Sequence, residues 1–270
     1  MQIAFTKMNG AGNDFLLIDN RSNEIHLTPQ QITRLCDRHR GVGADGIILL
    51  TPCTTGDADW AWDFYNNDGG SAEMCGNGAR CFARYVGKLT GVKKDFRFKT
   101  RAGIISARFN GDDTVTVTLT APRDLRLREN VSLNAGSSEI HSVNTGVPHA
   151  VLFVTDADKA MVQPIGSEVR FHSHFAPRGT NVNFVQVLGP NAIRVRTYER
   201  GVEGETLACG TGVTASALIA SEIHKFKSPI RVQVQGGDQL EVSFEGQGGK
   251  FANVALTGPA EFVFEGRMKV

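Results

Sequence analysis

Two short motifs of the form Cys-Gly-x-Gly contain the residues best suited to chemistry. They lie at 75–78 and 209–212, and a segment with helical periodicity follows each. The first N–H groups of a helix have no partner within the helix, and the helix dipole places partial positive charge there. Glycines leave these groups open to a carboxylate or phosphate, and the same environment lowers the pKa of a thiol. Each motif therefore predicts an anion site beside a reactive cysteine.

The two motifs belong to an internal repeat. Residues 40–50 and 75–78 match 178–188 and 209–212, and further matches keep the same order at offsets of 133 to 138 residues. Such a repeat indicates two homologous halves of about 120 residues each. We expect an N-terminal half, 1–122, that carries Cys75 and a C-terminal half, 123–270, that carries Cys209. The polar stretch that follows Pro122 would form the boundary, and the last strand, about 262–270, is a candidate to pack on the first half.

The chain is rich in predicted strands and has few helices. Helical periodicity is clear over 28–38, where Thr28 would cap the helix and Pro29 would begin it, and in the segments that begin at Gly76 and Gly210. Alternating apolar residues predict strands at 15–18, 47–50, 96–99, 115–119, 151–154, 184–188, 193–196, 230–234, 240–244 and 262–264. The expected fold is α+β. It has two pseudo-symmetric halves, each a curved, mainly antiparallel sheet around a central helix, with the active site in the cleft between them.

Two thiols at equivalent points of a duplicated chain suit inversion at a carbon that bears hydrogen. One group removes the proton from one face while the other delivers a proton to the opposite face. The two helix N-termini would hold the carboxylate of the substrate and stabilise its growing negative charge. The sequence therefore predicts racemisation or epimerisation by Cys75 and Cys209. Cys36, Cys53 and Cys81 lie outside this pattern, and Cys81 is expected in the core.

Composition excludes several other classes of function. The 29 Lys and Arg residues balance 28 Asp and Glu residues, so the formal net charge of +1 disfavours nucleic acid as a partner. The longest apolar runs have four or five residues, far from the roughly 20 that a membrane-spanning helix needs. The first residues lack the pattern of a signal peptide, which predicts a cytoplasmic protein with its five cysteines reduced.

Metal and phosphate sites are less favoured. The spacings Cys36 to His39 and Cys75 to Cys81 match no recognised zinc pattern, so we expect no metal. The loop 41–46 is rich in glycine, but no Gly-Lys-Ser or Gly-Lys-Thr follows it, so it is predicted to be a turn. A single Cys-Gly-x-Gly is often only a turn with a buried thiol, and the duplication argues against that interpretation here.

The chain resembles the diaminopimelate epimerases. The shared motifs are Met8–Phe15, Tyr65–Gly69, Met74–Cys81, Gly146–His149, Asn181–Phe184, Tyr198–Gly201 and Gly204–Gly212, in family order over essentially the whole chain. Enzymes of this family interconvert L,L- and meso-diaminopimelate, without pyridoxal phosphate, in lysine and peptidoglycan synthesis. The resemblance therefore implies an isomerase that uses no cofactor, binds a small zwitterionic substrate and forms a homodimer, with Phe264 as a dimer contact.

The resemblance also assigns roles to residues of the two halves. Cys75 would be the proton donor and Cys209 the acceptor, with His149 and Glu199 in support. The reacting end of the substrate would lie against Gly76, Asn77, Gly210 and Thr211. The distal end would be bound by Asn13, Asn66, Asn181, Glu199 and Arg200, of which Arg200 can pair with a carboxylate.

Two positions depart from the family pattern and leave alternatives open. Gly46 stands where some relatives carry Gln, and Val147 stands where many carry Asn, so both are weaker candidates for substrate binding. If Val147 removes a contact to the distal carboxylate, the chain could be a related cofactor-independent racemase, for instance of histidine. The other alternative is a non-catalytic anion-binding protein whose cysteine pair acts as a redox switch.

Overall fold

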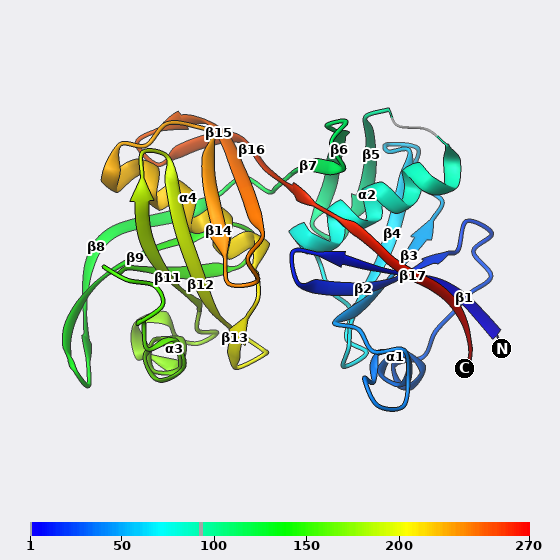
Figure 1. Ribbon diagram of the computed structural model, residues 1–270, viewed down its shortest axis with the longest axis horizontal. Coiled ribbons are helices and arrows are strands. Elements are labelled where there is room, and N and C mark those ends of the chain that lie inside the picture. Colours follow the sequence, from blue (N-terminus) through cyan, green and yellow to red (C-terminus); the bar gives the residue numbers. More distant parts are fainter. Residues whose placement is uncertain (1, 92–93) are drawn as a thin grey trace. The chain divides into compact units, whose positions relative to one another are not determined.

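The computed structural model describes residues 2–91 and 94–270, and the chain forms two compact units (Figure 1). The first unit contains the residues up to Thr118 together with Gly258–Val270, and the second unit is Leu119–Thr257. Within the described residues no helix is both long enough and apolar enough to cross a membrane.

Eight strands and two helices lie in the described part of the first unit. The strands are β1 (Gln2–Gly10), β2 (Asn13–Asp19), β3 (Gly46–Thr51), β4 (Trp60–Asn66), β5 (Phe96–Thr100), β6 (Gly103–Phe109), β7 (Thr114–Thr118) and β17 (Glu261–Lys269), and the helices are α1 (Pro29–Cys36) and α2 (Gly76–Thr90). The order in the sheet is β17-β1-β2-β3-β4-β5-β6-β7, and only β2–β3 and β4–β5 are parallel. The C-terminal strand therefore completes the edge of this sheet.

The second unit repeats this pattern of pairing. Its strands are β8 (Arg123–Leu133), β9 (Gly136–Asn144), β10 (Pro148–Phe153), β11 (Asn181–Gly189), β12 (Ala192–Glu199), β13 (Gly204–Thr206), β14 (Ile230–Val234), β15 (Gln239–Gln247) and β16 (Lys250–Pro259), with helices α3 (Val162–Phe171), η1 (Ser173–Phe175) and α4 (Gly210–His224). The order is β8-β9-β10-β11-β12-β14-β15-β16, and only β10–β11 and β12–β14 are parallel. In this comparison β17 takes the place in the first unit that β8 takes in the second.

A central helix lies against the curved sheet of each unit, α2 in the first and α4 in the second (Figure 1). Most of the residues in both helices are buried, and α4 carries apolar or small residues on all sides, as a helix enclosed by its own sheet requires. The predicted fold class, α+β with a mainly antiparallel curved sheet around a helix in each half, is confirmed. The predicted cap of α1 is confirmed too, because Thr28 and Gln31 form a capping box with Pro29 at the first position.

The predicted strands are all present, but the sequence missed others. The polar stretch after Pro122, where we expected the boundary of the two halves, forms the hairpin of β8 and β9. Most side chains of β8 are at least partly exposed, so its composition resembles that of a linker although its backbone pairs with β9. Helix α3 was missed because Pro164 and Gly166 interrupt its short apolar pattern.

The strand register also corrects the alignment of the repeat. Phe15 lies opposite Gly46 across β2 and β3, and His149 lies opposite Asn181 across β10 and β11. The neighbouring ladders give the same alignment, so these strands match at offsets of 134 and 135 residues rather than 136 and 138. The sequence comparison was out by two or three residues here. A slip of two returns every side chain to the same face of the sheet, so apolar alternation does not reveal it. The slip of three is hidden for another reason: β3 and the paired part of β11 are buried on both faces, so their apolar residues do not alternate.

Candidate functional site

The first cysteine of interest, Cys75, occupies the N-cap of α2. Its backbone is extended, and its half-buried sulfur accepts a hydrogen bond from the N–H of Gly78 at 3.4 Å. That N–H is one of the helix donors without a partner inside the helix, so the sulfur lies at the positive end of the dipole. The helix begins at Gly76 and the thiol of Cys75 lies at its N-terminus, both as predicted.

Asn13 lies against this sulfur from the start of β2. Its side-chain amide donates to a carboxylate oxygen of Asp45 at 2.5 Å, and its carbonyl oxygen is 3.5 Å from Sγ of Cys75. Because the amide nitrogen faces Asp45, only the oxygen can face the sulfur, and Cys75 must act as donor in this contact. The arrangement favours the protonated thiol of Cys75.

A cluster of charges stands behind Asn13. Arg38 contacts Asp14 through two nitrogens, at 3.0 and 2.8 Å, and Asp45 at 2.9 Å, while the buried Lys7 lies 2.6 Å from Asp14. Burial alone would raise the pKa of Asp14, but the hydrogen bonds and charges of Arg38 and Lys7 outweigh it and lower the pKa to about 2. This cluster could not be recognised in the sequence, because its members are spread over 7–45. It fixes the carboxylate of Asp45 that orients Asn13.

The other residues that were predicted in the first unit differ in the groups that they can present to a substrate. Asn77 is 1 % exposed, and its side-chain oxygen accepts from Arg80 at 3.1 Å, so a contact with substrate would use its backbone. Asn66 is exposed at the end of β4. Gly46 is buried, and a Cβ there would lie 2.6 Å from the carbonyl oxygen of Tyr65. No side chain larger than hydrogen fits at Gly46 without movement of that strand.

The second cysteine, Cys209, is the N-cap residue of α4 and is 8 % exposed. Its sulfur lies 3.5 Å from the hydroxyl of Thr211, and that hydroxyl lies 2.9 Å from Nε2 of His149. A further bond, 2.9 Å from the Thr145 hydroxyl to the carbonyl oxygen of Thr211, holds the backbone of this turn. The structure thus brings together three of the residues that the sequence predicted in this half.

His149 is completely buried on β10. Burial, aided by the positive charge of Arg200, lowers its pKa to about 3, so the ring is neutral near pH 7. Nδ1 of the ring contacts the side-chain amide of Asn183 on β11 at 3.2 Å. Sequence reasoning missed Asn183, although it lies within the conspicuous run Asn181-Val-Asn-Phe184.

A turn held by Glu203 carries the predicted pair Glu199 and Arg200, which are both half-buried. Glu203 accepts from the N–H of Gly201 at 3.0 Å and from Arg170 at 3.2 and 3.0 Å. Asn181 also holds this turn, because its side-chain oxygen accepts from the N–H of Arg200 at 2.9 Å. Burial and the nearby positive charges of Arg170 and Arg178 lower the pKa of Arg200.

Val147 and Gly46 are the two departures from the family pattern. The corrected register shows which residues of the other half correspond to them. His149 and Phe15 occupy equivalent positions of the repeat. Val147 and Asn13 each lie two residues before them, so Val147 and Asn13 are equivalent as well. By the same ladders Gly46 is the equivalent of Asn181. At each of these repeat positions one half keeps an amide side chain and the other lacks it.

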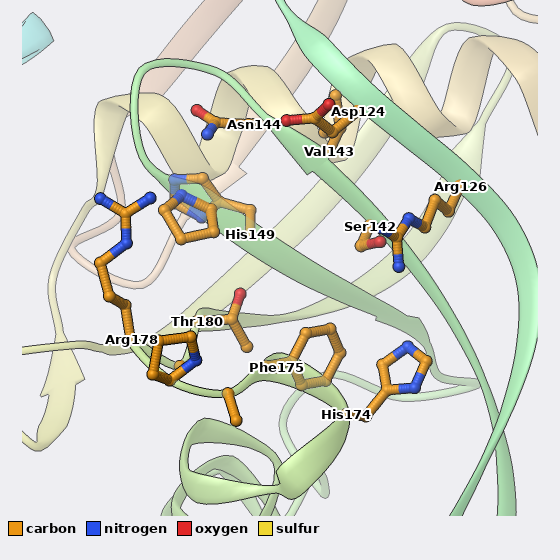
Figure 2. Close-up of a pocket in the computed structure, with 14 residues that line it drawn as sticks. Asp124, Arg126, Ser142, Val143, Asn144, His149, His174, Phe175, Arg178 and Thr180 are labelled. Carbon is orange, nitrogen blue, oxygen red and sulfur yellow. The ribbon is translucent and has the colours of Figure 1, made fainter.

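A polar cavity of about 310 Å³ opens beside His149 in the second unit (Figure 2). Its wall comes from the ends of β8, β9 and β10 and from the segment after α3, and Arg178 extends beside His149 in the close-up (Figure 2). It includes none of the other residues predicted in this half.

The second glycine of each motif has a different role from the one predicted. A Cβ on Gly212 would lie 2.3 Å from the side-chain oxygen of Asn183, and a Cβ on Gly78 would lie 3.0 Å from Cδ1 of Ile48. The prediction that these two glycines mainly keep side chains away from an anion is therefore incomplete. They let the start of each helix pack closely against its sheet.

Comparison with known proteins adds the family. The family model described as diaminopimelate epimerase matches residues 5–124 and 141–263. The chain belongs to the diaminopimelate epimerase family. Membership of this family makes it an isomerase. The diaminopimelate epimerase of Aquifex aeolicus is 42 % identical to it, over 98 % of this chain and 97 % of the relative, and that of Nitrosospira multiformis is 41 % identical over 100 % and 99 %.

Solved structures share the fold of this diaminopimelate epimerase family member at low sequence identity. A phenazine biosynthesis protein of the PhzF family from Bacillus anthracis superposes with a TM-score of 0.76 at 14 % identity, over the whole of both chains. A probable proline racemase from Agrobacterium radiobacter gives 0.73 at 16 % identity, over 99 % of this chain and 92 % of that one. These similarities concern the fold, which is therefore common to proteins named for different activities.

Proposed function

We propose that this chain inverts one stereocentre of diaminopimelate, converting the L,L isomer to the meso isomer, with Cys75 and Cys209 as the two acid/base groups. The observation that carries the proposal is the duplicated thiol at the first turn of the central helix in each unit. The relatives named diaminopimelate epimerase, about 40 % identical over nearly the full chain, support the choice of substrate.

The contacts of the two cysteines support opposite roles in the resting enzyme. Cys75 donates to the side-chain oxygen of Asn13, which suits a thiol that delivers a proton. Cys209 lies against a hydroxyl that is able to donate to it, which suits a thiolate that removes a proton. In the L,L-to-meso direction Cys209 would take the α-proton and Cys75 would protonate the opposite face. The reverse reaction exchanges these roles.

No cofactor is needed in this scheme, because the helix N-termini supply the stabilisation of charge. Removing the α-proton moves negative charge onto the α-carboxylate. Backbone N–H groups at Gly76, Asn77, Gly210 and Thr211 stand at the positive ends of α2 and α4 and would stabilise that charge. Asn77 would contribute through its backbone, since its side chain is buried against Arg80.

The distal end of the substrate would be bound by the residues that the family resemblance assigned to it. Arg200, held in place by Asn181 and the Glu203 turn, would pair with the distal carboxylate, and Glu199 with the distal ammonium. Asn13 and Asn66 would contribute amides from the first unit. Gly46 and Val147 offer no polar side chain, so their repeat partners Asn181 and Asn13 would provide the amide contacts.

We also propose that the enzyme works as a homodimer that associates through β17. Three consecutive apolar residues of this edge strand are exposed: Phe262, Val263 and Phe264, the last 47 % exposed. Phe264 rests edge-on against Phe5, with ring centroids 5.9 Å apart, so its position is fixed before association. An ordered apolar patch on an edge strand suits a partner of the same kind.

Solvent exchange of the α-proton tests the proposed reaction. The protein would be incubated with L,L-diaminopimelate in deuterated water under reducing conditions, without added pyridoxal phosphate or metal. We expect the meso isomer to form with deuterium at the inverted carbon. No deuterium uptake would overturn the proposal. Uptake with histidine but not with diaminopimelate would support the racemase, and anion binding that depends on the oxidation state, without exchange, would support the redox-switch protein.

A further inference from the structure

The surroundings of Cys209 contain a chain of hydrogen bonds whose direction is set by the backbone. The side-chain nitrogen of Asn183 lies 2.9 Å from the carbonyl oxygen of Ala150, which can only accept. The amide therefore points its N–H groups towards β10. Its oxygen accepts from the hydroxyl of Thr197 at 2.9 Å, directly across the ladder of β11 and β12. The carbonyl oxygen of Ala150 can only accept, so it decides the orientation of the amide, and the Thr197 hydroxyl, which is able to donate, fits that orientation.

This orientation decides which ring nitrogen of His149 carries the proton. The amide nitrogen of Asn183 is 3.2 Å from Nδ1, and a donor there requires Nδ1 to be unprotonated. The neutral ring then has its proton on Nε2. Complete burial and the positive charge of Arg200 keep the ring neutral, and beyond Arg200 lie the charged groups Arg170, Arg178 and Glu203.

The proton on Nε2 in turn directs the hydroxyl of Thr211. Nε2 donates across the 2.9 Å contact, so the Thr211 oxygen is an acceptor there and its single hydrogen can point elsewhere. The sulfur of Cys209 lies 3.5 Å from the same oxygen. A hydrogen bond donated to sulfur stabilises the thiolate over the thiol.

The start of α4 is shaped to hold this arrangement. The side-chain oxygen of Asn183 occupies the space that a Cβ of Gly212 would take, at 2.3 Å, and Cε1 of His149 lies 3.3 Å from the same point. Asn183, His149 and Thr197 are 0 %, 0 % and 3 % exposed. Buried polar groups with every contact oriented in one direction are rigid, because any reversal leaves two donors or two acceptors facing each other.

We propose that Asn183 and Thr197 are positioning residues for Cys209: they fix His149 in the Nε2-protonated form, so that Thr211 donates to the sulfur and favours the thiolate. The proposal rests on the proposed function in one respect only, the role of Cys209 as an acid/base thiol. It names two residues that do not touch the substrate. It also gives His149 a role through its tautomer rather than through its charge.

Nitrogen NMR of the protein labelled with ¹⁵N-histidine tests the tautomer without any turnover. The His149 signals would be assigned with a His149→Gln variant. We expect wild-type His149 to be protonated on Nε2 and unprotonated on Nδ1 near pH 7. In Asn183→Leu, which has a similar volume but no donor, both tautomers should be populated. A wild-type ring protonated on Nδ1 would overturn the proposal.

The reactivity of Cys209 tests the last hydrogen bond of this series, the one from Thr211 to the sulfur. Its alkylation by iodoacetamide would be followed against pH by peptide mass spectrometry, in a Cys75→Ala background. Thr211→Val and Asn183→Leu should each weaken the hydrogen bond to the Cys209 thiolate. The pH at which alkylation is half-maximal should therefore rise by about one unit in both variants. A smaller rise is expected in Thr197→Val. Thr211→Ser and Thr197→Ser keep the hydroxyls and should resemble the parent.

The matched control is Thr214→Val, because Thr214 is a buried residue of α4 whose hydroxyl donates to a helix carbonyl, that of Gly210 at 2.9 Å. Its midpoint should equal that of the parent. Equal midpoints in all variants would overturn the proposal. If Asn183→Leu does not fold, Thr197→Val and the wild-type spectrum still decide the question. Because neither readout needs substrate, a failed exchange assay and a failed hydrogen-bond chain remain distinguishable.

Discussion

Asn13 donates a hydrogen bond to Asp45, with 2.5 Å between the amide nitrogen and the carboxylate oxygen. This bond turns the other end of the amide, its oxygen, towards Cys75. The carboxylate of Asp45 therefore decides whether the sulfur of Cys75 faces the oxygen or the nitrogen of the Asn13 amide. The thiol of Cys75 is favoured by this contact, whereas Thr211 favours the thiolate of Cys209.

Replacing Asp45 should disturb Cys75 although Asp45 does not touch it. In Asp45→Asn the amide of Asn13 is no longer fixed and can present its nitrogen to the sulfur. We expect kcat/KM to fall roughly ten-fold, about 1.4 kcal/mol, with a changed pH profile. The control is Asp57→Asn, which removes an exposed carboxylate paired with Lys99. Steady-state rates from pH 6 to 9 provide the measurement, and an unchanged profile in Asp45→Asn would contradict this account.

The two cysteines should be equally necessary. Cys75→Ser and Cys209→Ser each replace a thiol by a hydroxyl that is far harder to ionise, so each should reduce inversion by about 10³-fold or more. Cys53→Ser is the matched control, because Cys53 contacts Thr55 and Asp57 and neither helix N-terminus. Conversion of the L,L to the meso isomer would be measured by chiral chromatography. Full activity in either variant would remove that cysteine from the mechanism.

The glycine at 212 should not tolerate even one methyl group. Gly212→Ala forces the side chain of Asn183 to move, since the new carbon would lie 2.3 Å from its oxygen. We expect the free energy of unfolding to fall by about 1–3 kcal/mol. The alkylation midpoint of Cys209 should rise as in Asn183→Leu. Gly189→Ala is the control, because a Cβ at the end of β11 meets nothing within 4 Å. Equal stability of the two variants, by urea unfolding, would refute this packing.

The charge cluster behind Asn13 should make stability depend on acid pH. The pKa of Asp14 is about 2 in the folded chain against 3.8 in its ordinary state. A lowered pKa stabilises the fold above pH 4, and this contribution is lost as the pH falls through 4 to 2. Asp14→Asn should therefore cost roughly 1–2 kcal/mol at pH 7, and the difference from wild type should shrink towards pH 2.5. Urea unfolding at several pH values, with exposed Asp95→Asn for comparison, checks this window; a constant difference would argue against it.

The apolar end of β17 should control association. Phe264→Ser removes one of the two exposed aromatic rings of β17 and should shift a homodimer towards monomer, because it reduces the apolar area buried on association. Sedimentation velocity at several concentrations would show the change. Phe171→Ser serves as the control, since Phe171 on α3 is 64 % exposed. If both variants sediment like the wild type, β17 is not the contact.

The fold class, the starts of α1, α2 and α4 and the positions of Cys75 and Cys209 followed from the sequence alone. The reason is that each depends on local chemistry: a thiol before glycines, a capping residue, and apolar alternation along a strand. The repeat was visible too, as was the family, because long motifs survive in order. The hairpin after Pro122 was not, since exposed strands look like linkers.

Tertiary structure alone revealed that Asp45 and Asn183 support the two cysteines through Asn13 and His149. Asp45 and Asn183 reach their partners through the register of neighbouring strands. The sequence does not reveal that register, because β3 and the paired part of β11 are buried on both faces and show no apolar alternation. The direction of a hydrogen bond is equally invisible in sequence. It follows from which groups face each amide, and at Asn183 the carbonyl oxygen of Ala150 determines it.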